Sequence, residues 1–315
     1  MMYLPTILGY FMTLILCILI ALRVENLFLQ WALLELNMLC FIPIFISRKT
    51  SNSTTNRLKY FVSQSSASLL FIIIIMLPLN SPLIILLLII FKIGVPPFQR
   101  WLTAILPTLN LSEIFILFTI QKFLPLIILS QFNSGLTLFI FILASFLFTL
   151  VRSSSTTSLY KLLFISSVVN IIWTLINLWN RWLIFFCGYT RIFGGLIINL
   201  SLFSISKTRD LIVGPTIAKI IIPIQFFNLG GVPPLAGFNL KLMLLNKIVN
   251  FNPPMTLILL ISTLITLYLY TIIFYQANCI TVSSMGSKLN LERNQQSNIA
   301  LGSLIATSFI LPIII

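Results

Sequence analysis

The chain has 315 residues, of which 59% are hydrophobic and only 8% charged, and its 19 Lys and Arg against 5 Asp and Glu give a net charge of +14. A soluble domain carries about 25% charged residues, so a chain this apolar could not cover its own surface in water. The composition excludes a soluble globular protein and predicts one that crosses a membrane several times.

Apolar runs, divided by polar or Pro/Gly positions, predict the membrane helices. A helix needs about 20 residues to cross the hydrocarbon core. We find eleven candidate runs, the ninth long and broken, and interpret the first as a membrane helix because nothing basic precedes it and no small-residue cleavage site follows. The predicted fold class is an all-α polytopic membrane protein with one integral membrane domain over 1–315. The runs cover 4–22, 27–46, 60–79, 83–101, 108–130, 135–151, 159–178, 182–204, 216–248, 254–276 and 298–314.

The basic residues lie mostly between these runs and predict the topology. When successive connections are assigned to alternate faces, the N-terminal face receives nine basic residues and the opposite face three. This excess places the N-terminus on the matrix or cytoplasmic side and the C-terminus on the other. It also accounts for the net charge without nucleic-acid binding. The nine are Arg48, Lys49, Arg57, Arg100, Arg152, Lys207, Arg209, Lys288 and Arg293, and the three are Arg23, Arg181 and Lys247.

Metal and haem ligands are scarce in this chain. Four cysteines (Cys17, Cys40, Cys187 and Cys279) stand far apart, and there is no histidine. No spacing suits zinc, haem or an iron–sulfur cluster, so we expect this chain to bind no cofactor or metal. Any redox step is then expected to belong to a partner.

The tetrapeptide Gly-Val-Pro-Pro occurs twice, at Gly94–Pro97 and at Gly231–Pro234, each inside an apolar run with a lysine nearby. The runs are the fourth and ninth, and because five is odd, equivalent helices would cross the membrane in opposite directions. This pattern is typical of an inverted-topology repeat with discontinuous helices at matching positions.

Four ionisable residues lie well inside apolar runs, where a charge is costly. They are Glu35, Lys92, Lys122 and Lys241. A charge at the bilayer centre costs about 2.5–3.5 kcal/mol, so we expect these groups to face protein or water and to interact with one another. A Lys–Glu pair in such a site can bind or release a proton when its partner moves, and we therefore interpret these residues as proton sites. The alternative is a set of buried ion pairs that only fixes helix packing.

Pro96 and Pro97 break the helix beside Lys92. The break leaves carbonyl groups that water or protein must satisfy, and it puts Lys92 in the last turn of a half-helix, where the negative end of the dipole stabilises a cation. Lys161 is a weaker candidate, since Ser166, Ser167 and Asn170 follow it and could extend a hydrated path. Its alternative is a lysine that reaches the surface from a helix end, as we expect for Lys59 and Lys219. Arg191 lies inside the eighth run, where it either lines the protein interior or marks a misplaced boundary of the run. We interpret Glu113 as a surface or loop charge.

With these residues in order, the chain resembles the NADH–ubiquinone oxidoreductase chain 2 family, a proton-pumping membrane subunit of respiratory complex I. The similarity spans nearly the whole chain, and the order of its motifs makes it more specific than any one of them. The matching stretches are "WALLELNMLCFIP" with Glu35, "KYFVSQSSAS" from Lys59, "KIGVPPFQRW" from Lys92, "QKFLP" with Lys122, "KLLFISSVVNIIW" from Lys161, "LGGVPPLAGFNLK" ending at Lys241, and "TLITLYLY" at Thr263–Tyr270.

The resemblance implies an antiporter-like fold with two inverted five-helix repeats, about 4–130 and 135–276, plus an extra helix at 298–314. It implies that Glu35 and Lys92 form the pair of the first repeat, that Lys122 is the central lysine, and that Lys241 is the proton site of the second repeat. NADH, FMN, iron–sulfur clusters and ubiquinone are then bound by partner subunits. The implied partners are an antiporter-like chain 4 on one side, small membrane chains such as 4L and 6 on the other, accessory subunits and the lipid bilayer of the mitochondrial inner membrane.

Two positions depart from the family pattern, and two other functions stay open. Where the family often has histidine, this chain has Gln99 and Asn170, which cannot titrate near neutral pH, so the proton route is expected to use water, Lys161 or a neighbour. The first alternative is a stand-alone cation/proton antiporter of related fold. The second is a non-transporting spacer that only holds the membrane arm together.

Overall fold

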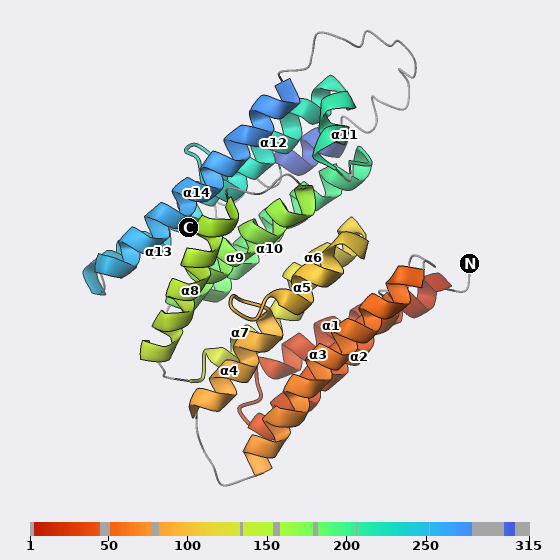
Figure 1. Ribbon diagram of the computed structural model, residues 1–315, viewed down its shortest axis with the longest axis vertical. Helices are drawn as coiled ribbons and strands as arrows, with labels where there is room; N and C mark the ends of the chain where they lie inside the picture. Colours follow the sequence, from red (N-terminus) through yellow and green to blue (C-terminus); the bar gives the residue numbers. More distant parts are fainter. Residues whose placement is uncertain are drawn as a thin grey trace. The chain divides into compact units, whose positions relative to one another are not determined.

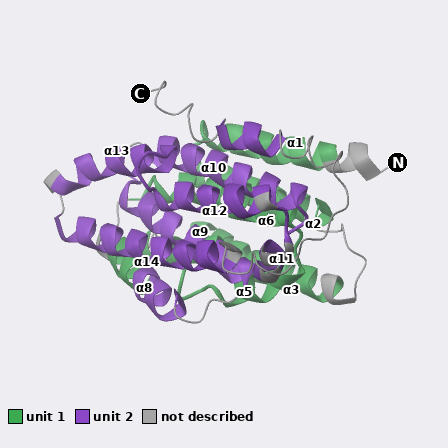
Figure 2. Ribbon diagram, turned by 90° about the horizontal axis from the view of Figure 1, so that it is seen from above, with its two compact units in different colours: residues 1–144 green, residues 145–315 purple. Residues whose placement is uncertain are grey.

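The computed structural model describes residues 3–44, 51–76, 82–132, 135–153, 158–178, 182–205, 207–251, 253–278 and 299–305. Within these ranges every regular element is a helix and no strand occurs (Figure 1). The all-α prediction is confirmed. The described chain divides into two compact units, residues 1–144 and 145–315, and the division falls inside α8, Gly135–Ser153 (Figure 2).

In the first unit, long apolar helices pack in sequence, and α4 and α7 form the interior. α1 packs on α2, α2 on α3, α3 on α4, and α4 on α7. The side chains of Ile90, Leu124 and Leu126 are fully buried where α4 and α7 lie together. The elements are α1 (Tyr3–Ala21), α2 (Leu27–Ile44), α3 (Ser51–Met76), α4 (Pro82–Ile93), α5 (Arg100–Ile105), η1 (Leu106–Thr108), α6 (Leu111–Phe118) and α7 (Ile120–Leu129).

In the second unit, α9 is the inner helix. Of the residues in its membrane span, 83% are buried, against 33% for the span of α14. α9 packs on both α10 and α14. Trp173 of α9 is fully buried and stacks on Phe185 of α10, with 6.0 Å between ring centroids. The elements are α9 (Leu159–Ile176), α10 (Trp182–Leu202), α11 (Thr208–Val213), α12 (Thr216–Gly230), α13 (Ala236–Phe251) and α14 (Pro253–Asn278).

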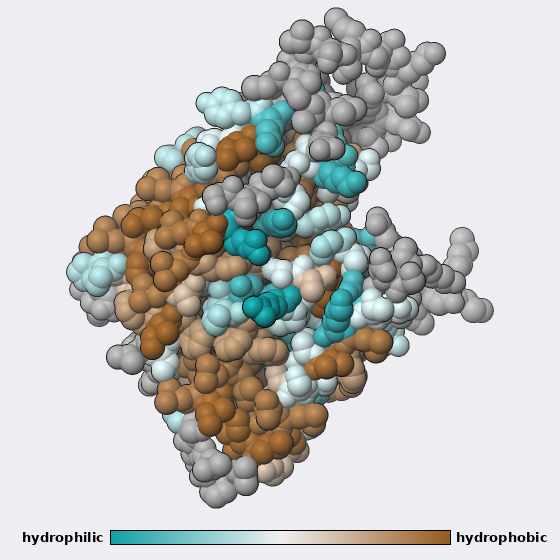
Figure 3. Space-filling view, viewed as in Figure 1, coloured by the Kyte–Doolittle hydropathy of each residue, from teal (hydrophilic) through white to brown (hydrophobic). Residues whose placement is uncertain are grey.

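The described helices have the length and surface of membrane spans. Six are long and apolar enough to cross a bilayer, in α2, α3, α6 with α7, α9, α10 and α14. Large hydrophobic side chains are exposed along α3 and α14, including Leu58 and Met76 on the first and Leu264 and Tyr268 on the second. Figure 3 shows broad hydrophobic areas over these helices. A surface of this kind is stable against lipid and unstable in water.

Both Gly-Val-Pro-Pro segments end a helix as the sequence predicts. α4 ends at Ile93, where Gly94 has φ +74°, and α12 ends at Gly230, where Gly231 has φ +81°. Glycine reaches this left-handed region at no steric cost. In each segment the Pro–Pro peptide bond is cis. The two discontinuities are confirmed, whereas the count of eleven helices and the inverted repeat stay predictions.

Three predicted helices differ from the observed ones. The run 83–101 gives a helix only to Ile93, because Gly94 and the prolines stop it, and α5 starts at Arg100. The run 108–130 divides at Thr119, where the backbone leaves helical geometry with φ −115° and ψ −79°. α3 begins at Ser51, well before the predicted residue 60. Of the run 298–314, only residues 299–305 are described, and they are helical.

Candidate functional site

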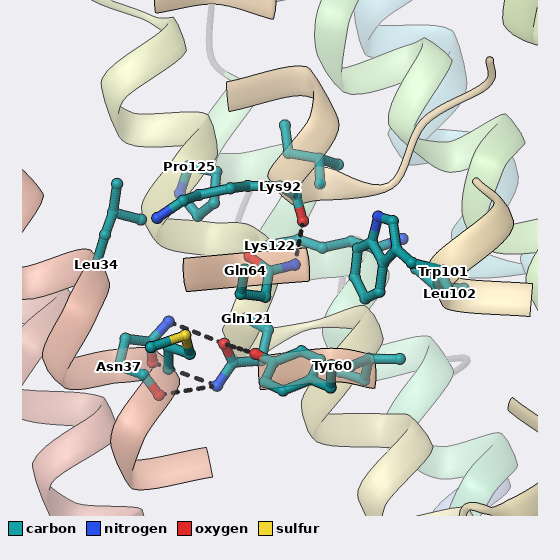
Figure 4. Close-up of a pocket in the computed structure, with 13 residues that line it drawn as sticks. Leu34, Asn37, Tyr60, Gln64, Lys92, Trp101, Leu102, Gln121, Lys122 and Pro125 are labelled. Atoms are coloured by element: carbon teal, nitrogen blue, oxygen red, sulfur yellow. Dashed lines mark hydrogen bonds between the residues drawn. The ribbon is translucent and has the colours of Figure 1, made fainter. Parts of the chain in front are cut away.

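A polar cavity lies among the apolar helices of the first unit (Figure 4). α2, α3, α4, α5, α6 and α7 all contribute to its wall. It provides about 20 Å³ for the centre of a water molecule, which is room for about one water. Its polar lining consists of Asn37, Tyr60, Gln64, Lys92, Trp101, Gln121 and Lys122.

Two predicted proton sites, Lys92 and Lys122, both line this cavity. Their side chains are 8% and 3% exposed. In Figure 4 Lys92 extends towards Leu34 and Lys122 towards Trp101. The Lys122 ammonium also lies 4.7 Å from the centroid of the Phe118 ring, within the range of a cation–π contact. A buried ammonium group is costly unless polar groups or water surround it, so the lining has to supply that environment for each lysine.

Glu35 lies on α2 beside the cavity but does not line it. Its side chain is partly exposed, and its charge interacts with the Lys92 ammonium. Within the described part of the chain the two groups form no direct ion pair. The carboxylate therefore acts on Lys92 through space, and its assignment as the partner of Lys92 stays a prediction.

Gln121, next to Lys122, joins three helices at the cavity wall. Its Oε1 accepts hydrogen bonds from Asn37 Nδ2 at 3.1 Å and from the Tyr60 hydroxyl at 3.2 Å. Its Nε2 lies 3.4 Å from both the carbonyl oxygen and Oδ1 of Asn37. These contacts hold α2 and α3 against α7 at the residue preceding Lys122 (Figure 4).

The break after α4 creates an acceptor that the cavity wall satisfies. In a continuous helix the Lys92 carbonyl would accept a hydrogen bond from residue 96, but Pro96 has no N–H. Gln64 Nε2 donates to this carbonyl instead, at 3.2 Å. Trp101 Nε1 donates to the neighbouring Phe91 carbonyl at 3.2 Å. Side chains of α3 and α5 thus stabilise the broken end of the helix that carries Lys92.

In the second unit, Lys241 donates a hydrogen bond to the carbonyl that the second break leaves without a helical donor. The Gly230 carbonyl would accept a helical hydrogen bond from residue 234, which is Pro234 and has no N–H. The buried Lys241 ammonium donates to this carbonyl at 2.6 Å, from the second turn of α13. It also lies 5.7 Å from the centroid of the Trp173 ring. A cation is therefore held at the negative end of the α12 dipole.

The close approach of α12 and α13 depends on Gly237. Its backbone N–H donates to Asn228 Oδ1 at 2.9 Å, and a Cβ at this position would collide with the Asn228 carbonyl oxygen. Gly231 has little more room, because a Cβ there would lie 2.8 Å from Lys241 Cδ. The two glycines let the lysine reach back to the end of α12.

The remaining charges are placed as follows. Lys161 is exposed at the start of α9, whereas Ser166, Ser167 and Asn170 are buried along the same helix, so its role stays a prediction. Arg191 is also exposed. The interpretation of Glu113 as a surface charge is wrong, because it is 4% exposed and its Oε2 accepts from the Asn110 backbone N–H at 2.9 Å in the capping box of α6.

Lys219 was expected to reach the surface from a helix end, and this is wrong because its side chain is only 8% exposed. The sequence reasoning also did not propose the other five polar residues of the first cavity as site residues, which are Asn37, Tyr60, Gln64, Trp101 and Gln121. Tyr60 and Gln64 are spaced four apart in an apolar helix, which puts them on one face, and this spacing could have identified them. Gln121 could have been found because it is a polar residue inside an apolar run, next to Lys122 and two positions after Thr119.

Relatives of known name match most of the chain, although no protein-family model matches it. The chain is 31% identical over 261 residues to NADH-ubiquinone oxidoreductase chain 2 of Aedes aegypti, covering 76% of each protein. It is 29% identical over 293 residues to the protein of that name from Anopheles gambiae, covering 86% of each. To that from Pongo abelii it is 29% identical over 325 residues, covering 91% of this chain and 90% of the other.

Two solved structures share the fold. A chain in the structure of respiratory complex I from Thermus thermophilus with bound aureothin aligns with a TM-score of 0.68 at 15% identity, covering 98% of this chain and 79% of that one. A chain of the Mrp complex from Dietzia sp. DQ12-45-1b aligns with a TM-score of 0.68 at 12% identity, covering 90% and 71%. At these identities the likeness shows the fold alone.

Proposed function

Because the chain belongs to the NADH-ubiquinone oxidoreductase chain 2 family, we propose that it is a proton-translocating membrane subunit of respiratory complex I. Its place is the mitochondrial inner membrane, with the N-terminus on the matrix side and the C-terminus on the intermembrane side. Partner subunits carry the electrons from NADH to ubiquinone with their own flavin and iron–sulfur centres. The chain contributes to the enzyme NADH:ubiquinone reductase by moving protons, with no redox step of its own.

The presence of both Lys92 and Lys122 in the wall of one polar cavity supports this proposal most strongly. Each charge costs about 2.5–3.5 kcal/mol at the bilayer centre on insertion scales, and such residues usually mark an ion or proton pathway. A lysine in this setting can exist as an ammonium or a neutral amine, depending on what surrounds it. The cavity has room for about one water, which can bridge two groups that do not touch.

The surrounding residues then have separate roles. Lys92 and Lys122 hold the protons of the first unit, and Glu35, which lies on α2 beside the cavity, is the partner that modulates Lys92. Gln64 and Gln121 fix the helix ends from which the two lysines extend. Lys241 holds the proton of the second unit. A proton that leaves Lys241 weakens its charge-assisted hydrogen bond to Gly230, so its release depends on the state of the break between α12 and α13.

The partners follow from the same proposal. We assign the antiporter-like chain 4 and the small membrane chains 4L and 6 as neighbours, with accessory subunits around them. The exposed hydrophobic side chains of α3 and α14 are available to such neighbours and to lipid. Coupling to electron transfer then reaches the lysines through charge and conformational changes passed along the membrane arm.

A stand-alone cation/proton antiporter is the second candidate, and the likeness in fold to the chain of the Mrp complex favours it. Such a protein would work without NADH or a redox arm. Gentle solubilisation and purification separate the two. Co-migration with a large assembly that contains flavin and iron–sulfur absorbance supports the first function, and an assembly without these chromophores supports the second.

The substitution Lys92→Met tests the proton role in the assembled complex. Methionine keeps an unbranched side chain one atom shorter and removes the charge, so we expect normal assembly and loss of the NADH oxidation that is coupled to proton pumping. Lys59→Met is the matched control, because Lys59 is an exposed lysine of the same unit. Normal coupled turnover in an assembled Lys92→Met complex would exclude the role of Lys92. A non-transporting spacer predicts that neither variant alters pumping per electron.

A further inference from the structure

A second small cavity lies in the second unit beside Lys241. Three polar residues line it, Asn170 of α9, Tyr189 of α10 and Lys241 of α13, together with apolar side chains of α10, α12 and α13. It provides about 10 Å³ for the centre of a water molecule, close to the volume that one water requires.

Tyr189 on this wall has a buried hydroxyl without a partner. Its side chain is only 3% exposed, and its hydroxyl makes no hydrogen bond to any residue that the structure describes. Leaving a buried polar group unpaired is unfavourable, and buried polar groups in proteins are nearly always bonded to protein or to ordered water. Because Tyr189 lines a cavity of about the size of one water, a water bound there could supply the missing partner of its hydroxyl.

Asn170 and Lys241 offer the other contacts that such a water needs. Asn170 Nδ2 donates to the Ser166 carbonyl at 2.7 Å, which leaves Oδ1 as an acceptor. An ammonium has three N–H donors, and the described contacts of Lys241 Nζ use one of them on the Gly230 carbonyl. A water can accept from Lys241 and Tyr189 and donate to Asn170. Buried waters typically make about three hydrogen bonds.

We propose that Asn170, Tyr189 and Lys241 bind one ordered water molecule, and that Tyr189 is the positioning residue that holds this water against the Lys241 ammonium. The water restores part of the hydration that burial removes from the charge. The water site itself depends only on the local geometry. Its effect on pumping rests on the proposed proton role of Lys241.

Tyr189→Phe tests the site because it removes one hydroxyl and leaves the ring. Tyr275→Phe is the matched control, since it loses the same group from α14 at a side chain that is 65% exposed. In the intact complex, electron microscopy at a resolution that shows waters should reveal density within hydrogen-bond distance of Lys241 Nζ, Asn170 Oδ1 and the Tyr189 hydroxyl. This density should persist in Tyr275→Phe and disappear in Tyr189→Phe.

Coupled NADH oxidation should fall about tenfold in Tyr189→Phe, which corresponds to about 1.4 kcal/mol, and stay unchanged in Tyr275→Phe. An empty cavity in the native complex overturns the water site. Loss of the water without any change in coupled turnover overturns the positioning role of Tyr189.

Lys241→Met separates this inference from the proposed function. If Lys241→Met pumps normally while the native complex shows the water, the proton role of Lys241 fails and the water site stands. If Lys241→Met stops pumping while the native cavity is empty, the water site fails and the proton role stands.

Discussion

The substitution Gln121→Met removes the hydrogen bonds that join α2, α3 and α7 beside Lys122 while keeping the volume of the side chain. The buried Asn37 amide loses its acceptor, which costs about 1–3 kcal/mol, and the hydrogen bond from Tyr60 contributes about 1 kcal/mol. We therefore expect the local opening of α7 to become easier by about 2–4 kcal/mol. At about 1.4 kcal/mol per factor of ten, this raises the population of the locally open state of α7 by about 30- to 700-fold.

Hydrogen exchange of the assembled complex, read by mass spectrometry on peptides of α7, measures this change, because exchange of a buried amide follows local opening. Gln131→Met is the matched control, since Gln131 is exposed just after the end of α7. We expect faster exchange of α7 only in Gln121→Met, together with slower proton pumping. If exchange in α7 is the same in both variants, the Gln121 contacts do not hold the wall of the cavity, and the reasoning is wrong.

Two further substitutions test the packing around the site. Gly237→Ala places a Cβ against the Asn228 carbonyl, so the amount of assembled complex should fall more than tenfold. In the control Gly9→Ala nothing lies within 4 Å of the added Cβ, so this variant should assemble normally. Equal amounts of the two complexes on native gels would contradict the tight contact. Glu113→Gln weakens the capping box at Asn110 by about 1 kcal/mol, so the first turn of α6 should exchange about fivefold faster, and unchanged exchange there would mean that the cap contributes nothing.

The features that the sequence predicts correctly are those that depend on local chemistry. A left-handed glycine and two prolines stop a helix wherever they occur, so both breaks are visible in the order of residues around Gly94 and Gly231. Composition likewise indicates the six membrane spans that the described residues contain. The division at Thr119 was missed because a local departure of the backbone from helical angles leaves no mark on hydropathy.

The features that the sequence does not predict depend on which helices meet. Lys92 and Lys122 are 30 positions apart, and only the packing of α4 on α7 brings them to one cavity. The use of Gln64 as a donor to the Lys92 carbonyl likewise requires α3 to lie beside the break. Glu113 was misassigned because a carboxylate near a helix start can be exposed or can turn back to cap it, and only the geometry distinguishes the two.

The number of protons translocated per electron tests the central claim most directly. Complex I containing Lys122→Met is reconstituted into sealed vesicles, and acidification of the lumen is measured together with NADH consumption. We expect a lower proton-to-electron ratio, or a complete stop of both processes, because a buried group that carries the proton has been removed. The exposed Lys59→Met should keep the native ratio. A native ratio at native turnover in Lys122→Met would contradict the account.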